Sequence, residues 1–125
     1  MWTPGRPEVI ERLDAEGLLP AITFIFSRAG CEAAVQQCLY AGLRLNDEEA
    51  REQVRALVEE RTAHIVPEDL HVLGYYEWLE GLERGIAAHH AGMLPTFKEV
   101  VEELFVRGLV KAVFATETLA LGINM

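Results

Sequence analysis

The fold of this chain is indicated by an apolar stretch that runs directly into a polar turn, Ala21-Ile22-Thr23-Phe24-Ile25-Phe26-Ser27-Arg28-Ala29-Gly30. Its first six residues are rich in aromatic and β-branched side chains, which is typical of a β-strand buried on both faces. Pro20 stands before the stretch and prevents a helix from continuing into it. We expect a helix over about residues 30–40 to follow the turn. A buried strand, a polar turn and a helix in this order are the unit from which parallel sheets are built.

The same pattern recurs twice toward the C-terminus. Residues 85–90 form a short stretch of mostly small side chains, and residues 110–115 form a third apolar run. Both stretches are predicted to be strands. A helix is predicted between them, beginning at Pro95 and ending at Gly108. Its apolar positions repeat at helical spacing: Phe97, Val100, Val101, Leu104 and Phe105.

Three more helices are predicted from apolar spacing and helix boundary signals. The first lies within residues 7–19 and is ended by Gly17. The second covers residues 47–63, with Asn46 as its N-cap and acidic residues in its first turn. The third covers residues 67–83. Strands separated by helices indicate right-handed crossovers, and therefore an α/β fold with a parallel sheet covered by helices on both faces.

In such sheets, ligands gather beyond the carboxyl ends of the strands. The segments expected there are all polar and carry glycine or hydroxyl groups: Ser27-Arg28-Ala29-Gly30, His89-His90-Ala91-Gly92 and Thr116-Glu117-Thr118. Hydroxyl donors, a fixed cation and glycines that allow close backbone approach suit a row of phosphates. The alternatives are a helix cap with a surface ion pair for Ser27-Arg28 and an ordinary helix start for the two threonines.

Length and charge limit the function classes. The 125 residues suffice for one domain, and the formal net charge is −9. Eleven acidic residues and three arginines lie between Asp47 and Glu83, so the rest of the chain carries a net charge of only −1. The acidity of residues 46–84 is most simply that of solvated helix faces, and it does not exclude a nucleic-acid partner elsewhere on the surface.

Several other chemistries are disfavoured. His89 and His90 would point to opposite faces of a strand, and the remaining histidines lack metal-ligand spacing, so no metal site is predicted. No G-x-x-x-x-G-K-[ST] loop and no nucleophile motif occurs. Cys31 and Cys38 would lie about 10 Å apart on one helix, too far for a disulfide, which predicts buried reduced thiols. No signal peptide or membrane-length apolar run is seen, and we expect a cytoplasmic protein.

Three motifs in order resemble superfamily-two helicases. Residues 22–32 resemble motif IV, residues 88–95 resemble the His-His-Ala-Gly segment, and residues 114–125 resemble motif V. Together they resemble the Ski2-like group, which includes exosome-associated RNA helicases, and most of all its actinobacterial-type members. The acidic segment matches only loosely.

This resemblance implies an ATP-dependent helicase with two RecA-like domains. Residues 1–125 would then be part of the second domain, a three-layer sheet of the P-loop NTPase type that is incomplete at the C-terminus and inactive alone. Motifs I, II and VI are absent from this chain. The implied partners are single-stranded nucleic acid, RNA rather than DNA, and the first RecA-like domain, which would bind most of the ATP and Mg²⁺. The exposed sheet edge would be a further site of association, and no membrane partner is expected.

The resemblance also implies roles for individual residues. Those expected to contact the nucleic acid are Ser27, Arg28, His90, Ala91, Gly92, Thr116 and Thr118. Gly122 and Asn124 would approach ATP, and Glu117 would couple the two sites. The alternative is a small α/β protein-binding module that docks a partner through its acidic helices. A phosphatase-like enzyme is disfavoured further, because no nucleophile turn is present.

Overall fold

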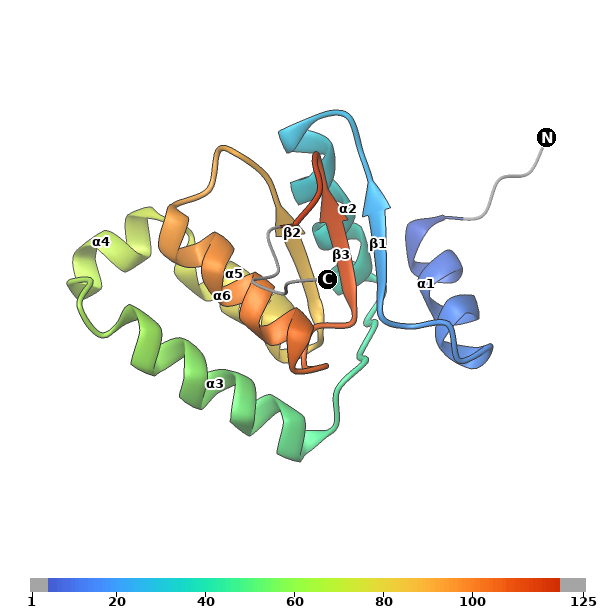
Figure 1. The fold of residues 1–125 in the computed structure, drawn as a ribbon, viewed down its shortest axis with the longest axis horizontal. Coiled ribbons are helices and arrows are strands. Elements are labelled where there is room, and N and C mark those ends of the chain that lie inside the picture. Colours follow the sequence, from blue (N-terminus) through green and yellow to red (C-terminus); the bar gives the residue numbers. More distant parts are fainter. Residues whose placement is uncertain (1–4, 120–125) are drawn as a thin grey trace.

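A computed structural model describes residues 5–119 of the chain, in which three strands alternate with helices (Figure 1). In chain order the elements are α1 (Arg6–Ala15), β1 (Ala21–Phe24), α2 (Arg28–Tyr40), α3 (Glu48–Thr62), α4 (Pro67–Val72), α5 (Tyr75–Glu83), β2 (Ile86–His89), α6 (Pro95–Val106) and β3 (Ala112–Ala115). No helix in this range is long and apolar enough to cross a membrane.

The three strands form one parallel sheet in the order β1-β3-β2. The central strand β3 pairs Phe114 with Thr23 of β1 on one side and with Ala88 of β2 on the other. All three strands therefore end at the same edge of the sheet, and the predicted α/β fold with a parallel sheet is confirmed.

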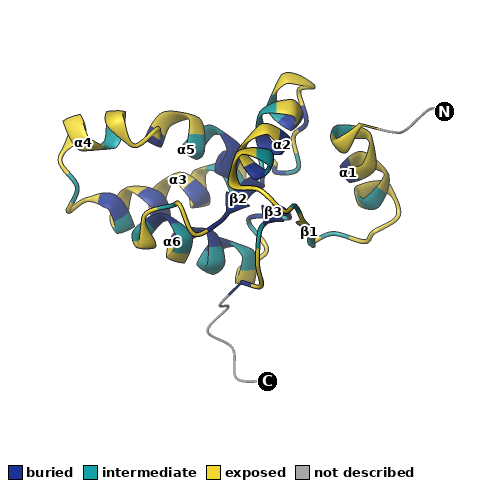
Figure 2. Ribbon diagram, turned by 90° about the horizontal axis from the view of Figure 1, so that it is seen from above, coloured by how far each residue is buried: buried dark blue, intermediate teal, exposed yellow. Residues whose placement is uncertain are grey.

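Helices cover both faces of the sheet (Figure 2). The alternation of side chains along the strands explains why. Ile86, Ala88, Ala112 and Phe114 point to the face covered by α1 and α2. The intervening residues Ala87, Val113 and Ala115 point to the face covered by α3, α5 and α6. Two apolar clusters result, one on each side, which gives the three layers expected of a RecA-like domain.

The first strand differs from its prediction. It was expected to be buried on both faces, but Phe24 is 56% exposed and Phe26, just beyond the strand, is fully exposed. The reason is its position: β1 lies at the edge of the described sheet and pairs only with β3. An apolar run predicts a strand, whereas its burial depends on neighbouring elements that the run does not reveal.

The start of α3 also differs. Asp47, not Asn46, is the N-cap, and its Oδ1 accepts the N–H of Ala50 at 2.8 Å. The Asn46 side chain turns inward, and its Nδ2 donates to the carbonyl oxygens of Glu83 (3.1 Å) and Leu109 (2.8 Å). Asn46 therefore ties three distant segments together instead of capping a helix.

The helix predicted over residues 67–83 is broken into α4 and α5. Gly74 adopts a φ of +73° between them, in the left-handed region that favours glycine. The helix predicted to be ended by Gly17 is α1, which ends at Ala15, and Gly17 follows its C-cap with a φ of +71°. In both places a glycine with positive φ ends a helix.

The acidic segment, residues 46–84, contributes side chains to the hydrophobic core and is not only a solvated surface. Val54, Leu57 and Val58 of α3 and Leu82 of α5 belong to the cluster beneath α6. Its arginines are also engaged. Arg51 and Arg55 both contact the buried carboxylate of Glu83, at 3.3 and 2.8 Å, while Arg61 pairs with Glu103 of α6 at 2.9 Å.

Cys31 and Cys38 are buried and unpaired, on the side of α2 that faces the sheet. Burial raises the pKa of both thiols, that of Cys38 from 9.0 to about 11. At neutral pH we expect neither thiol to react with iodoacetamide in the folded chain and both to react after unfolding in guanidinium. Rapid labelling of the folded chain would contradict this placement.

The same shift predicts a pH dependence of stability. Above about pH 9 the unfolded chain releases the thiol proton while the folded chain retains it, so the free energy of unfolding falls as the pH rises from about 9 to about 11. The measurement is urea unfolding across this range, with Cys38→Ala as the matched variant, whose stability should fall less steeply.

Candidate nucleic-acid interface

The three predicted turns lie at one edge of the sheet, because each follows the carboxyl end of a parallel strand. Backbone hydrogen bonds connect the three strand ends across that edge. The N–H of Ile25 donates to the carbonyl oxygen of Ala115 (2.9 Å), and the N–H of Thr116 donates to that of His89 (3.3 Å). The turn after β3 is therefore flanked by the other two; the sequence predicted a shared edge for the three turns but not their order.

The turn after β1 forms the N-terminus of α2. Ser27 is extended and is the N-cap, and its Oγ accepts the N–H of Gly30 at 2.9 Å. A Cβ on Gly30 would lie 2.7 Å from that Oγ and 2.8 Å from Ile25 Cγ2, so only glycine fits there. The first turn of α2 carries no acidic residue. The partial positive charge of this helix end and the Arg28 guanidinium therefore add in the same place.

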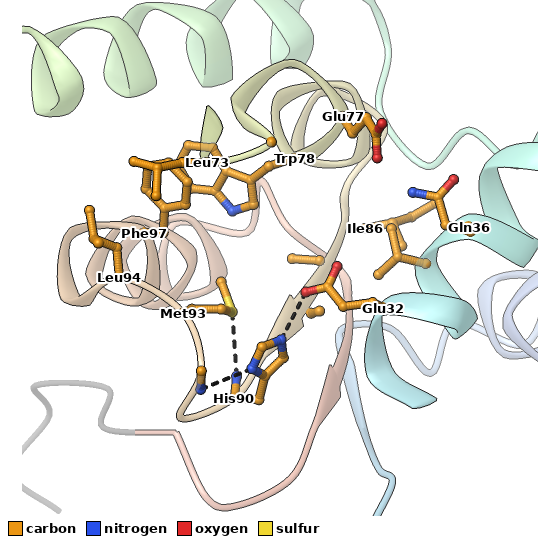
Figure 3. A pocket seen from close by; sticks show the side chains of 15 residues that line it. Glu32, Gln36, Leu73, Glu77, Trp78, Ile86, His90, Met93, Leu94 and Phe97 are labelled. Carbon is orange, nitrogen blue, oxygen red and sulfur yellow. Dashed lines mark hydrogen bonds and ion pairs between the residues drawn. The ribbon is translucent and has the colours of Figure 1, made fainter. Parts of the chain in front are cut away.

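The turn after β2 is held by the His90 ring (Figure 3). Its Nδ1 lies 3.1 Å from the N–H of Gly92, and its Nε2 lies 2.8 Å from Glu32 Oε1 of α2. Met93 closes the turn, since its N–H donates to the His90 carbonyl oxygen at 3.2 Å. The backbone of Ala91 and Gly92 is exposed at the surface of this turn.

Arg28 and Gly92, from two different turns, lie next to each other. A Cβ on Gly92 would lie 3.2 Å from Arg28 Cδ and 3.2 Å from His90 Nδ1, so the missing side chain makes room for the arginine. The exposed guanidinium of Arg28 has no ion pair within residues 5–119. The structure thus brings together a free cation and a glycine turn that were predicted separately.

His89 lies on the opposite face of the sheet from His90, as predicted. Its Nε2 is 2.8 Å from Glu102 Oε2 of α6, whereas His90 contacts α2. His89 Nδ1 is buried and has no hydrogen-bond partner in the described part of the chain. Among the described residues, no group of three potential metal ligands comes together.

The turn after β3 supplies the remaining predicted contacts. Thr116 is half-buried, while Glu117 and Thr118 are exposed beside the other two turns. Gly122 and Asn124, the residues expected to approach ATP, lie outside the described residues.

A cavity of about 270 Å³ lies next to the β2 turn (Figure 3). Trp78 of α5 stacks on Phe97 of α6 at one end, with ring centroids 4.0 Å apart, and Glu32 and His90 line the other. Sequence reasoning missed both this cavity and the link from Glu32 to His90. Residues 58 positions apart give no local signal of their contact, although Glu32 lies within the motif IV match.

No protein-family profile matches the chain. It is 70% identical over 122 residues to the "Probable helicase HelY" of Mycobacterium tuberculosis. This alignment covers 98% of this chain and 14% of the length of that protein. It is 49% identical, over 98% of its length, to the "DExH-box ATP-dependent RNA helicase DExH15 chloroplastic" of Arabidopsis thaliana, of which it covers 10%. It is 35% identical, over 95% of its length, to the "Antiviral helicase SKI2" of Saccharomyces cerevisiae, of which it covers 9%.

This chain is homologous to a segment of the Ski2-like helicases. The resemblance inferred from three motifs is therefore confirmed, and the layered sheet is that expected of a RecA-like domain fragment. The chain spans 14% or less of the length of these three relatives. The roles of single residues in this Ski2-like segment remain predictions.

Proposed function

We propose that this chain is the part of an ATP-dependent RNA helicase that contacts the backbone of a single strand. One observation carries the proposal: three polar turns meet at the carboxyl edge of the sheet, and the cation of Arg28, unpaired among residues 5–119, lies beside the Gly92 turn. A free guanidinium, a helix N-terminus and hydroxyl groups on one edge are the usual partners of phosphates.

The chemistry of these groups sets the kind of binding expected. Arg28, Ser27, Thr116 and Thr118 would contact phosphates and sugars, and the turn of Ala91 and Gly92 would present its backbone. None of these contacts distinguishes one base from another, so binding should be weakly sequence-specific and strongly salt-dependent. Two of the three relatives described above are named as helicases, and a third as an RNA helicase, which favours RNA as the strand.

ATP hydrolysis would need more than this segment. ATP and Mg²⁺ would be bound mainly by a first RecA-like domain, since no phosphate loop occurs in this chain. Gly122 and Asn124 would complete the nucleotide site across the cleft between the domains, and Glu117 would couple that site to the bound strand. Closure of the two domains would stabilise charge on the transferred phosphoryl group and move this lobe along the strand. We propose a cytoplasmic location for such an enzyme.

The alternative, a protein-binding module without catalytic activity, predicts a different use of the surface. The acidic helices α3 to α5 would then carry the function, and the strand-end turns would tolerate substitution. The names of the relatives favour the helicase. The exposed β1 edge, with Phe24 and Phe26, would serve as a further site of association in either case.

The proposal is tested by Thr116→Ala in the full-length helicase, with Thr116→Ser as the matched control that keeps the hydroxyl group. We expect RNA-stimulated ATP hydrolysis to fall about tenfold in Thr116→Ala, as for one lost hydrogen bond of about 1.4 kcal/mol, while ATP affinity in the absence of RNA stays within about twofold. Thr116→Ser should behave like the wild type. Full stimulation in Thr116→Ala would contradict the assigned contact.

A further inference from the structure

The His90 ring uses both of its nitrogens inside the protein. Nδ1 is 3.1 Å from the Gly92 N–H, and Nε2 is 2.8 Å from Glu32 Oε1. The residue is only 7% exposed. Neither nitrogen is left to contact a phosphate, so the part that His90 plays in the turn has to be indirect.

The two contacts select one form of the ring. A backbone N–H can only donate, so Nδ1 has to accept the hydrogen of Gly92 and carries no proton. The proton of the neutral ring is then on Nε2, where it is donated to the Glu32 carboxylate, which can only accept. Glu32 thereby favours the one neutral form of His90 that can hold the Gly92 N–H.

The negative charge of Glu32 lies where it would weaken the binding of a nucleic acid. It is one helical turn after Arg28 on α2, and its side chain is 56% exposed. A carboxylate there repels phosphates near the Arg28 cation. Removal of its charge alone would therefore raise, and not lower, the affinity for a nucleic acid.

We infer that Glu32 is a positioning residue of the proposed nucleic-acid interface, acting through His90 to hold the Gly92 turn against Arg28. The inference rests on the function proposed above. The chain of contacts runs from the Glu32 carboxylate to Nε2, from Nδ1 to the Gly92 N–H, and from the open side of Gly92 to Arg28 Cδ. Without Glu32, the His90 ring would be free to rotate. The Gly92 peptide group would then lose its fixed orientation, and the Arg28 side chain would lose its fixed position beside Gly92.

The first test observes the ring directly. In the chain labelled with ¹⁵N-histidine, NMR at about pH 8 distinguishes a proton on Nε2 from one on Nδ1. We expect the proton on Nε2 in the wild type and in Glu32→Gln, whose amide oxygen still accepts it. In Glu32→Ala we expect a mixture of both forms. A proton on Nδ1 in the wild type, or the same form in all three proteins, would overturn the inference.

The second test measures the affinity of the full-length helicase for single-stranded oligo(U) RNA. We expect Glu32→Ala to bind about fivefold more weakly, as for a lost hydrogen bond of about 1 kcal/mol, and Glu32→Gln to bind within about twofold of the wild type. Glu52→Ala, on an exposed position of α3, controls for the lost negative charge. Tighter binding by both Glu32 variants would show a charge effect alone and would overturn the inference.

A double substitution separates action through His90 from direct contact. In His90→Asn, the amide oxygen can still accept the Gly92 N–H, but nothing takes the place of Nε2. Glu32→Ala should then cause no further loss of RNA affinity, whereas a residue that touches RNA directly would give an additive loss. Additive losses would overturn the inference. If the wild-type helicase does not bind RNA at all, the proposed function fails, and the role of Glu32 in RNA binding fails with it. The expected NMR pattern would then still show that Glu32 selects the form of the His90 ring.

Discussion

Asn46→Asp is expected to lower the free energy of unfolding of this chain by about 3 kcal/mol, because it removes two hydrogen bonds and leaves a charge in a buried, unpaired position. Asn46 is 9% exposed, and its Nδ2 donates to the carbonyl oxygens of Glu83 and Leu109. A carboxylate has no hydrogen to donate and would face both oxygens with like partial charge. Urea unfolding followed by circular dichroism gives the change.

The neighbouring residue provides the matched control. Asp47→Asn exchanges the same two residue types in the opposite direction one position later, where the side chain only caps α3. Asparagine and aspartate are about equally good N-caps, so we expect a change of about 0.5 kcal/mol or less. Equal losses in both variants would mean that Asn46 does not join the segment before α3 to the end of α5 and to the segment before β3.

This pair also illustrates what the sequence could not predict. Asn46 and Asp47 are both good capping residues in front of the same helix, so local signals favour neither. What decides between them is a carbonyl oxygen 63 positions further along the chain, at Leu109. Contacts over such distances arise only when the sheet has brought α5 and β3 together.

The layers of the fold were predictable because they follow from periodicity. Alternate residues of β3, such as Val113 and Phe114, face opposite apolar clusters, and the apolar stripe of α6 meets one of them. The order of the strands was not predictable in the same way, because three apolar runs do not tell which one is central. The exposed Phe24 at the sheet edge is the consequence.

The candidate site was predictable in position and only partly in detail. Parallel strands have to end at one edge, so the meeting of the three turns followed from the α/β fold alone. Arg28 lies beside Gly92, 64 positions later in the chain, and Glu32 contacts His90, 58 positions later. Spacing along the chain carries no sign of either, and the break at Gly74 shows that even a local signal is easily overlooked.

Arg28→Glu is expected to weaken the binding of single-stranded RNA by the full-length helicase by about 30-fold, the largest functional effect predicted here, because it replaces an unpaired cation at the strand-end turns by an anion. Arg28→Ala should weaken binding by about fivefold to tenfold. The matched control is Arg44→Ala. Arg44 is also exposed, but it precedes Leu45, whose carbonyl accepts from Lys111 Nζ, just before β3 begins. It therefore lies at the amino ends of the strands, across the sheet from the turns.

The most direct test of the central claim is the salt dependence of oligo(U) binding for the wild type, Arg28→Ala and Arg44→Ala. A contact between Arg28 and one phosphate of a single strand predicts that Arg28→Ala reduces the slope of log affinity against log salt concentration by about 0.7. Arg44→Ala should keep the wild-type slope. If the two variants gave the same slope and the same affinity, the strand-end turns would not be the nucleic-acid interface.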